Sequence, residues 1–449
     1  MAIFKSDGTS FQKVDKVFNR RTNDIARIQK VWVHNGTKYI LVKGRMLEVI
    51  WETDLSTYGG ASWDNSNRLP YNNVISHPYI TNSGDLIGVV NAVIKNNSSD
   101  YYSGSRKALM KITSSGEISS FSPYTSWTSW RSVAGYTYTA HPIGWVKRGD
   151  YYVTFSDMGI FDMFNASGGH ISHCEIVNWH TDGTCKNYGM NSISRGDFDI
   201  IFACLEETTN VLYFLVTDQN DSGSDTSSYM SSVWRMGIPN TSFATTPYRH
   251  YAGVRQARTY STSNSILIDS ETHKGIATFC NRKNSAEHSL VVFDASAATY
   301  TTKSDVSALC SLTMPSTEIE YPVATKNGYV YTYFHNGNYY NECIRKRSLT
   351  DLSSIWTVSI TPDELNCGYI HQPLVPYDDG GFLLPNGDVI YEDGYVLRSN
   401  KIYKPNKYDW DAKVKSYTFD EDLGIGYMVQ YSGTSENICS VLKFKEVLK

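Results

Sequence analysis

Residues 322–334 read PVATKNGYVYTYF, in which a proline is followed six positions later by glycine and then by an apolar strand. The same order recurs at Pro78 to Gly84 before LIGVV, at Pro142 to Gly149 before DYYVTF, and at Pro373 to Gly380 before GFLL. These units start 64, 180 and 51 residues apart, so a period of about 60 predicts two degenerate copies inside the long interval. The repeated unit is a small antiparallel sheet. A chain that tiles such sheets is expected to form a β-propeller.

Seven strand-pair units can be counted along the chain. The segment ALMKITSSGEISSF of the first unit alternates apolar residues, turns at Ser-Gly and returns. Helical periodicity is weak, so an all-β fold is predicted. The interval between the last two strand-pair units is shorter than the others, so a count of six to eight blades stays open. Several separate β-sandwiches would give similar spacing and remain an alternative. We expect strand material from both ends of the propeller segment to close the ring. The leading strands are expected to begin near Gly84, Ile143, Asp199, Ser265, Pro322, Gly381 and Leu423.

Residues 1–53 differ from the rest and contain two similar hairpins. IFKSDGTSFQKV turns at Asp7-Gly8 and VWVHNGTKYILV turns at Asn35-Gly36, and these dipeptides are strong hairpin signals because both central positions favour positive φ. The small sheet cannot bury much surface alone, so we expect it to dock on another body. The predicted organisation is a docking module at 1–53, a connecting loop at 54–77 and the propeller at 78–449. The candidate docking side chains are Phe4, Phe11, Trp32 and Tyr39.

The bulk composition restricts the classes of partner. A net charge of −4 argues against nucleic acid as the main partner, and the longest apolar run, Leu86 to Ile94 broken by Asn91, is too short to span a bilayer. The first residues carry Lys5 and Asp7 and no apolar core of a secretory signal, so we expect synthesis and folding in a cytoplasm. The eight cysteines show no paired spacing, which favours buried free thiols.

Metal-binding and catalytic motifs are weak, and neither a metal, a cofactor nor a catalytic residue is assigned. A group of potential ligands at His170, His173, Cys174, His180 and Cys185 matches no zinc spacing. A glycosidase would need two carboxylates facing a pocket, and the sequence cannot pair its candidates. These candidates are Asp85, Asp150, Asp199 and Asp388, several of which recur at the edge of a leading strand, where a turn residue is expected.

Aromatic residues are the better indication of a binding surface. The chain has 33 Tyr and 10 Trp, and the segment SPYTSWTSWRSVAGYTYT interleaves such rings with Ser and Thr. Aromatic faces stack on sugar rings or anchor protein interfaces, although packing between blades is the alternative for the Trp residues. Candidate ligand-binding residues are Tyr124, Trp127 and Trp130 in this segment, Tyr339 and Tyr340 after an Asn-Gly turn, and Tyr101 and Tyr102.

The N-terminal pattern, DGTSF followed by VWVHNGTKYILV, resembles short aromatic-glycine modules at the N-termini of tailed-bacteriophage virion proteins. The resemblance covers about the first fifty residues. It implies a tail, fibre or baseplate component made in the bacterial cytoplasm, which binds other virion proteins through residues 1–53. The propeller would then present a surface for a bacterial glycan or protein receptor, or for a neighbouring subunit. Homo-oligomerisation, a glycan-degrading enzyme and a cellular interaction platform stay open as alternatives.

Overall fold

The computed structural model describes the following residues, and every structural statement below concerns them: 3–6, 11–14, 20–21, 24–25, 30–34, 39–54, 76–94, 104–123, 130–133, 136–139, 142–156, 160–165, 169–175, 177–179, 185–186, 198–218, 230–238, 241–243, 248–251, 266–280, 288–296, 306–315, 317–336, 342–360, 374–378, 380–397, 412–432 and 439–448. Within these ranges, the side chains of residues before Leu47 and of some later strand residues, such as Asp199, lie outside the described ones.

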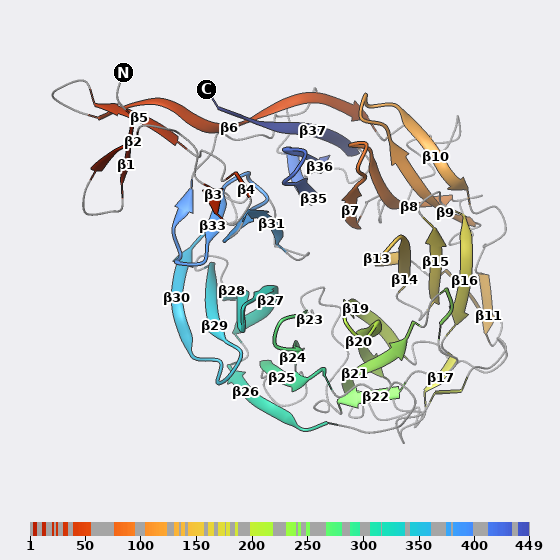
Figure 1. The fold of residues 1–449 in the computed structure, drawn as a ribbon. Coiled ribbons are helices and arrows are strands. Elements are labelled where there is room, and N and C mark those ends of the chain that lie inside the picture. Colours follow the sequence, from red (N-terminus) through yellow and green to blue (C-terminus); the bar gives the residue numbers. More distant parts are fainter. Residues whose placement is uncertain are drawn as a thin grey trace.

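These residues form a ring of seven antiparallel sheets of four strands each around a central axis (Figure 1). The predicted β-propeller is therefore confirmed, and the number of blades is seven. No helix occurs in the described ranges. Within each blade, successive strands of the chain pair with one another from the axis outward, except at the last blade.

Each blade is named by its order along the chain. Blade 1 is β7 (Ser76–Ile80), β8 (Leu86–Ile94), β9 (Gly104–Ile112) and β10 (Ile118–Pro123); blade 2 is β13 (Pro142–Arg148), β14 (Tyr151–Ser156), β15 (Ile160–Asn165) and β16 (His170–Glu175). Blade 3 is β19 (Phe198–Glu206), β20 (Val211–Asp218), β21 (Met230–Gly237) and β22 (Tyr248–Tyr251); blade 4 is β23 (Ile266–Asp269), β24 (Lys274–Cys280), β25 (His288–Asp294) and β26 (Ala308–Met314). Blade 5 is β27 (Glu318–Lys326), β28 (Tyr329–Asn336), β29 (Cys343–Ser348) and β30 (Ser354–Ser359); blade 6 is β31 (Val375–Asp378), β32 (Gly381–Leu383), β33 (Val389–Tyr391) and β34 (Val396–Leu397). Blade 7 is β35 (Ala412–Asp420), β36 (Ile425–Ser432), β37 (Cys439–Leu448) and β6 (Tyr39–Asp54).

The leading strands predicted near Ile143, Asp199, Ser265 and Pro322 are the first strands of blades 2 to 5. In the other three blades the first strand begins earlier than predicted, at Ser76, Val375 and Ala412. Gly84 and Gly381 stand before or at the second strand, and Leu423 lies in the turn after β35. The apolar strand that follows glycine in the repeat is therefore the second strand of its blade.

Ring closure depends on β6, which comes from the N-terminal region. Residues Arg45 to Asp54 pair with Leu448 to Ser440 of β37, so β6 is the outermost strand of blade 7. β6 therefore crosses the predicted boundary between a module at 1–53 and a propeller at 78–449. The boundary is corrected to lie within β6, and the closing strand comes from the predicted docking module, not from the segment 78–449.

The remaining N-terminal strands extend the sheet of blade 7 beyond the ring. β1 (Ile3–Ser6) pairs with β2 (Phe11–Val14), and β5 (Lys30–His34) pairs with residues Tyr39 to Gly44 of β6. Both predicted hairpins are confirmed by these pairings. Figure 1 shows this N-terminal sheet projecting from the ring beside the C-terminal end of β37. Three further two-stranded sheets are β3 (Arg20–Arg21) with β4 (Asp24–Ile25), β11 (Trp130–Val133) with β12 (Tyr136–Thr139), and β17 (Val177–Trp179) with β18 (Cys185–Lys186).

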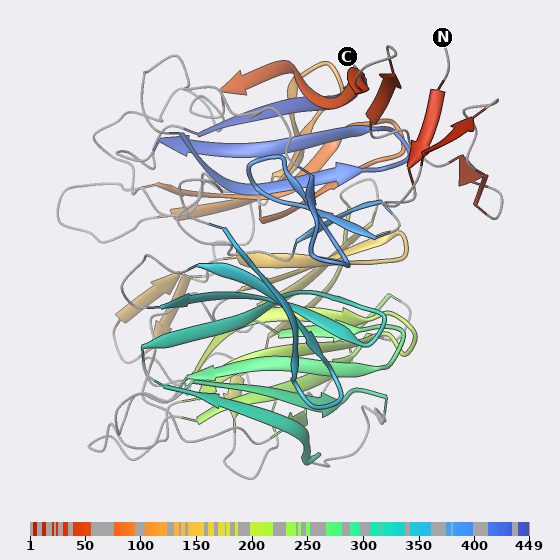
Figure 2. The same ribbon diagram turned by 90° about the vertical axis from the view of Figure 1, so that its left-hand side faces the viewer.

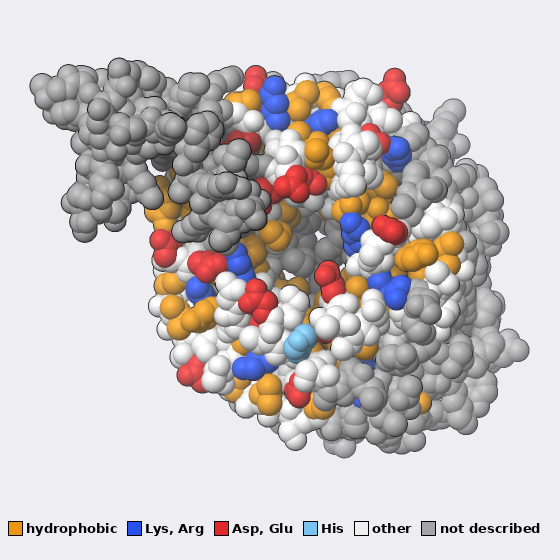
Figure 3. All heavy atoms as spheres, viewed as in Figure 1, with side chains coloured by type: hydrophobic (Ala, Val, Ile, Leu, Met, Phe, Trp, Pro, Cys, Tyr) orange, Lys and Arg blue, Asp and Glu red, His pale blue; other side chains and the backbone are white. Residues whose placement is uncertain are grey.

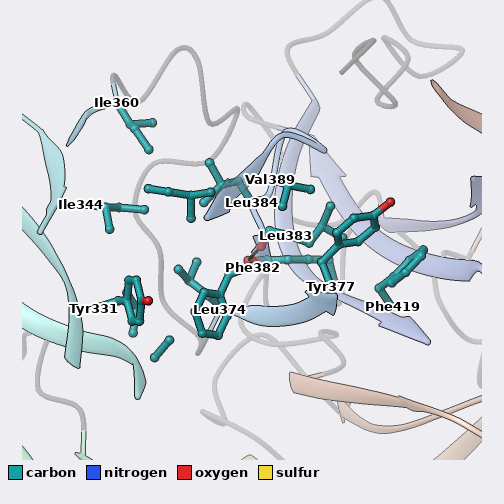
Figure 4. Packing of buried hydrophobic residues seen from close by; sticks show 14 of the residues in the cluster. Tyr331, Ile344, Ile360, Leu374, Tyr377, Phe382, Leu383, Leu384, Val389 and Phe419 are labelled. Carbon is teal, nitrogen blue, oxygen red and sulfur yellow. Dashed lines mark hydrogen bonds between the residues drawn. The ribbon is translucent and has the colours of Figure 1, made fainter. Parts of the chain in front are cut away.

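The apolar core lies between adjacent blades. One cluster joins blades 5, 6 and 7, where Tyr331 and Ile344 pack toward Phe382 and Leu383, with Phe419 beyond them (Figure 4). Other clusters join blades 3 to 5, blades 2 and 3, and blades 7 and 1. Sheets with two apolar faces can bury both only by packing face to face, and the ring provides such a neighbour for every blade.

The two faces of the ring carry different connections. Because consecutive strands are antiparallel, connections from first to second and from third to fourth strands lie on one face, which we call the turn face. Connections from second to third strands, and those between blades, lie on the opposite face, which we call the loop face. Figure 2 shows the short hairpin turns and the N-terminal sheet on the same side of the ring.

Candidate functional site

The predicted ligand-binding residues follow strands that end on the loop face, and all except Trp130 lie outside the described residues. Tyr101 and Tyr102 stand between β8 and β9, and Tyr339 and Tyr340 stand between β28 and β29. The connection from blade 1 to blade 2 holds the rest, Tyr124, Trp127 and Trp130. The side chains of all seven lie outside the described residues, although the backbone of Trp130 is the first residue of β11. The strand order therefore places the described strand ends beside these residues on one face, and nothing further about the residues themselves is described.

The predicted docking residues belong to the N-terminal sheet. Phe4 is in β1, Phe11 is in β2 opposite Ser6, Trp32 is in β5, and Tyr39 is the first residue of β6. Their side chains also lie outside the described ones. The backbone pairing places all four in one sheet beyond the ring.

The turn face is rich in charged side chains, which surround the hollow at the ring axis (Figure 3). Polar links cross every joint between neighbouring blades. From joint 1–2 onward the linked pairs are Tyr79 with Lys147, Arg148 with Asn210, Glu206 with His273, Asp269 with the Gly328 amide, Lys326 with Glu392, the Leu383 carbonyl with Tyr417, and the Gly84 carbonyl with Tyr427. Many charged groups on this face are therefore used to hold blades together.

One arrangement at these joints occurs twice in nearly the same form. In blade 5, Lys346 Nζ and Trp356 Nε1 both donate to the carbonyl oxygen of Glu392, at 3.0 and 2.8 Å. The Trp356 ring packs on Gly394 of the same blade 6 turn, and Tyr331 contacts the Trp ring edge-on. We call this set of Tyr, Lys and Trp on the second, third and fourth strands the clasp of joint 5–6.

The clasp of joint 7–1 uses the closing strand. Lys443 Nζ and Trp51 Nε1 donate to the Ser114 carbonyl oxygen at 2.8 and 3.1 Å, and the Trp51 ring packs on Gly116. Tyr427 contacts the Trp51 ring edge-on at 5.7 Å between centroids. Thr53 Oγ1 adds a hydrogen bond to the Gly116 carbonyl at 2.8 Å. Burial lowers the pKa of Lys443, as it does that of Lys346 in the other clasp.

A related arrangement occupies joint 3–4. Tyr213 donates to the Ala295 carbonyl, and Arg235 Nη1 donates to His250 Nδ1 at 2.7 Å. Because a guanidinium offers no acceptor, His250 carries its proton on Nε2 and donates it to the Asp294 carbonyl at 2.7 Å. Joints 3–4, 5–6 and 7–1 thus share a buried tyrosine and a buried cation. At the same place in the second strand, the intervening blades 2, 4 and 6 have aliphatic residues, Val153, Ile276 and Leu383.

Blade 5 also buries a complete ionic network. Glu320 is fully buried and accepts from Arg347 Nε at 2.6 Å and Nη2 at 3.0 Å, and from Arg345 Nη1 at 2.9 Å. Thr332 donates to the same carboxylate, and Arg347 Nη1 reaches the Leu352 carbonyl. Burial would raise the pKa of Glu320, but hydrogen bonds and charge from Arg347 hold it below its ordinary value. Its carboxylate is therefore ionised and committed to structure.

The carboxylates considered for glycan cleavage occupy different faces. Asp85 and Asp150 are in first turns on the turn face, and Asp388 is in the β32–β33 turn on the loop face, where it accepts from Asn386. Asp85 accepts from Lys111 and the Ser114 amide, contacts which lower its pKa despite burial. The Asp199 side chain lies outside the described ones. A general acid needs a raised pKa, so Asp85 does not suit that role.

The candidate metal ligands and thiols show ordinary packing where they are described. Cys174 is buried and donates to Met236 Sδ at 3.8 Å; within the described ranges no group of three His, Cys, Asp or Glu could hold a metal. Desolvation raises the pKa of Cys204, Cys310 and Cys343, so these groups are thiols at neutral pH. In the part of the chain that is described, no helix is long and apolar enough to cross a membrane.

No protein-family model and no curated protein matches the chain. It is similar to a structure from an analysis of two prolyl endopeptidases, with a TM-score of 0.40 and 10% identity, covering 85% of this chain and 51% of that one. The chain therefore spans about half the length of that protein. It is also similar to the computationally designed Ika8 protein, with a TM-score of 0.41 and 9% identity, covering 83% and 87% of the two chains. The propeller is assigned here from its own strand pairing.

Sequence reasoning missed the clasps. A signal was present, since Tyr213, Tyr331 and Tyr427 are each the third residue of a second strand, and each pairs with a basic residue on the next strand. It could not be read without knowing the register of the third strands. The tryptophan of the closing clasp is more than 370 residues from its Tyr427 partner in the sequence, so no local pattern links them.

Proposed function

We propose that this chain is a structural protein of a tailed-bacteriophage virion, a tail, fibre or baseplate component that acts by binding, not by catalysis. The N-terminal sheet attaches to other virion proteins, and the propeller presents its loop face to a bacterial surface glycan or protein or to a neighbouring subunit. The chain is made in the host cytoplasm and functions in the particle.

The observation that supports this proposal best is the separation of the two candidate surfaces. The N-terminal sheet leaves blade 7 at the turn-face end of β6, where Arg45 pairs with Leu448. The described strand ends that flank the candidate ligand-binding aromatics lie on the opposite face. A protein attached through its N-terminal sheet would therefore direct its loops away from the point of attachment, which is the geometry that an adsorption component needs.

The turn face is consistent with a scaffold. Its carboxylates at Asp85, Glu206 and Asp269 accept hydrogen bonds from neighbouring groups. Hydrogen bonds also lower the pKa values of Asp85 and Glu206 against the effect of burial. These groups stabilise turns and joints, which is the role expected in a binding platform.

Mass spectrometry of purified phage particles from the source of this sequence tests the proposal. We expect peptides of this chain in the particle at a fixed copy number, which would distinguish a fibre tip from a repeated baseplate part. Particles that contain the established head and tail proteins but not this chain would overturn the virion role.

A further inference from the structure

The strand β6 belongs to two structures at once. Its residues Tyr39 to Gly44 pair with β5 in the N-terminal sheet, and Arg45 to Asp54 pair with β37 in blade 7. No residue of the described strand separates the two sets of pairs. The N-terminal sheet and the closing blade therefore share a continuous backbone.

The ring half of β6 is held by contacts with two blades. Leu47 is 1% exposed in the cluster that joins blades 5, 6 and 7. Trp51 and Thr53 reach across joint 7–1 to the carbonyl oxygens of Ser114 and Gly116. Joint 7–1 is where the two ends of the ring meet, so these contacts help to close the ring together with those of Lys443 and Tyr427.

The N-terminal half belongs to a small sheet in which β2, β1, β5 and residues Tyr39 to Gly44 of β6 lie side by side. A sheet of this size depends on packing against another body for independent stability. The alignment of β6 on the ring fixes one strand of that sheet in the extended conformation. Conversely, a body that holds the N-terminal sheet fixes the strand that closes the ring.

We propose that β6 couples attachment to ring closure: holding the N-terminal sheet tightens joint 7–1, and weakening joint 7–1 loosens the N-terminal sheet. Such coupling is reciprocal by thermodynamic necessity. The proposal extends the proposed attachment role to a regulatory one. It rests on the pairing of β6 and is independent of which partner binds.

Hydrogen exchange measured by mass spectrometry on the full chain tests whether weakening joint 7–1 loosens the N-terminal sheet. Trp51→Phe removes the donor to the Ser114 carbonyl and keeps an aromatic ring. We expect exchange of the β5 amides, Lys30 to His34, to accelerate roughly fivefold, the change that the loss of one net hydrogen bond corresponds to. The matched control is Trp356→Phe, which removes the same donor from the clasp of joint 5–6 and should leave β5 exchange unchanged.

A disulfide that substitutes for a bound partner tests whether holding the N-terminal sheet tightens joint 7–1. Val33 and Ile40 lie opposite each other in the β5–β6 pairing, so Val33→Cys with Ile40→Cys can lock the N-terminal sheet. We expect oxidation to slow exchange in β37 and in the 113–117 turn of blade 1, with no change in blade 4 and reversal on reduction. Two results would overturn the coupling. One is an exchange rate of the β5 amides that is the same in Trp51→Phe as in wild type, and the other is an exchange rate at joint 7–1 that does not change when the disulfide forms. The particle measurement above is unaffected by either result, so the two proposals fail separately.

Discussion

Glu320 shows how single side chains fix one blade. Its buried carboxylate is the common acceptor for two guanidinium groups from β29 and for the hydroxyl of Thr332 on β28, so it ties the first three strands together. Its own carbonyl accepts from Thr278 of blade 4 at 3.0 Å, which extends the connection across joint 4–5. Removing one partner of such a network leaves buried charge without compensation.

Glu320→Gln is therefore expected to lower the free energy of unfolding by about 3–5 kcal/mol at pH 7. The pKa of Glu320 is lowered from 4.5 in the folded chain, so its contribution is complete above 4.5 and is lost as pH falls through the folded pKa. The difference between wild type and variant should shrink below pH 4.5. Urea unfolding at several pH values measures this.

Glu318→Gln is the matched control, because Glu318 is on the same strand and partly exposed. Its effect should stay within about 0.5 kcal/mol. A loss of stability in Glu320→Gln that is the same at every pH would show that shape, and not charge, is what the network provides.

In blades 4 and 7, the second residue of the second strand is a glycine, and packing explains why no larger residue fits there. Gly275 and Gly426 lie opposite Phe293 and Phe444, and a Cβ at either glycine would stand 2.2 Å from the ring. Both rings are fully buried and have little room to move. The flat aromatic face covers the bare backbone of the neighbouring strand.

Gly275→Ala is expected to cost about 1–3 kcal/mol through overpacking against Phe293. The control is Gly380→Ala, whose Cβ would first meet Glu392 at 3.8 Å, an ordinary contact. Thermal unfolding of the two variants compares them. Equal stability of both variants would mean that the Phe293 ring relaxes without cost.

At the scale of elements, β6 determines where the propeller begins. Its ring half supplies the outermost strand of blade 7 and hides the edge of β37, which would otherwise offer unpaired backbone groups. Blade 6, in contrast to the long strand β6, has strands of only two to four residues. Its Phe382 and Leu383 nevertheless join the cluster of blades 5 to 7, so its neighbours supply the burial that its short strands lack.

Two N-terminal truncations separate the two halves of β6. A chain that starts at Tyr39 keeps the closing strand and should remain folded and monodisperse, whereas one that starts at Leu55 should aggregate or melt at lower temperature. Loss of the Leu47 side chain alone is worth about 2–5 kcal/mol. Size-exclusion chromatography and thermal unfolding follow both chains. A stable propeller without β6 would show that blade 7 is complete with three strands.

At the scale of the molecule, the closed ring separates a turn face from a loop face. Short turns with glycine at positive φ, such as Gly328 at 77°, bring neighbouring blades into polar contact on the turn face. The strand ends that lead from one blade to the next lie on the other face. Loops supported by a rigid scaffold are common sites of binding.

The double variant Tyr339→Ala with Tyr340→Ala is expected to lower phage adsorption to host cells about tenfold or more, as loss of two aromatic anchors would. Its melting temperature should match wild type. Tyr395→Ala is the control, since Tyr395 is an exposed tyrosine of the turn face. Adsorption that is unchanged in the double variant, or reduced equally in the control, would remove Tyr339 and Tyr340 from the binding surface.

Local signals in the sequence were sufficient for the class of fold. The apolar strands LIGVV and YVYTYF and glycine turns such as Asn327-Gly328 reflect backbone preferences that act within one hairpin, and the period of about 60 residues repeats that signal along the chain. They predicted a β-propeller and both N-terminal hairpins. They misplaced three first strands, because the glycine and apolar run that mark the repeat stand at the second strand of the blade.

The tertiary structure alone decided how the ring closes and what its charged and aromatic residues do. Trp51 meets Tyr427 and Ser114, and Glu320 meets Arg345 and Arg347, through registers set by packing between strands and blades. Such pairings depend on distances in space between segments far apart in the chain, so no local preference encodes them. The sequence by itself therefore determined which elements form, and the burial of both faces of every blade determined how they join.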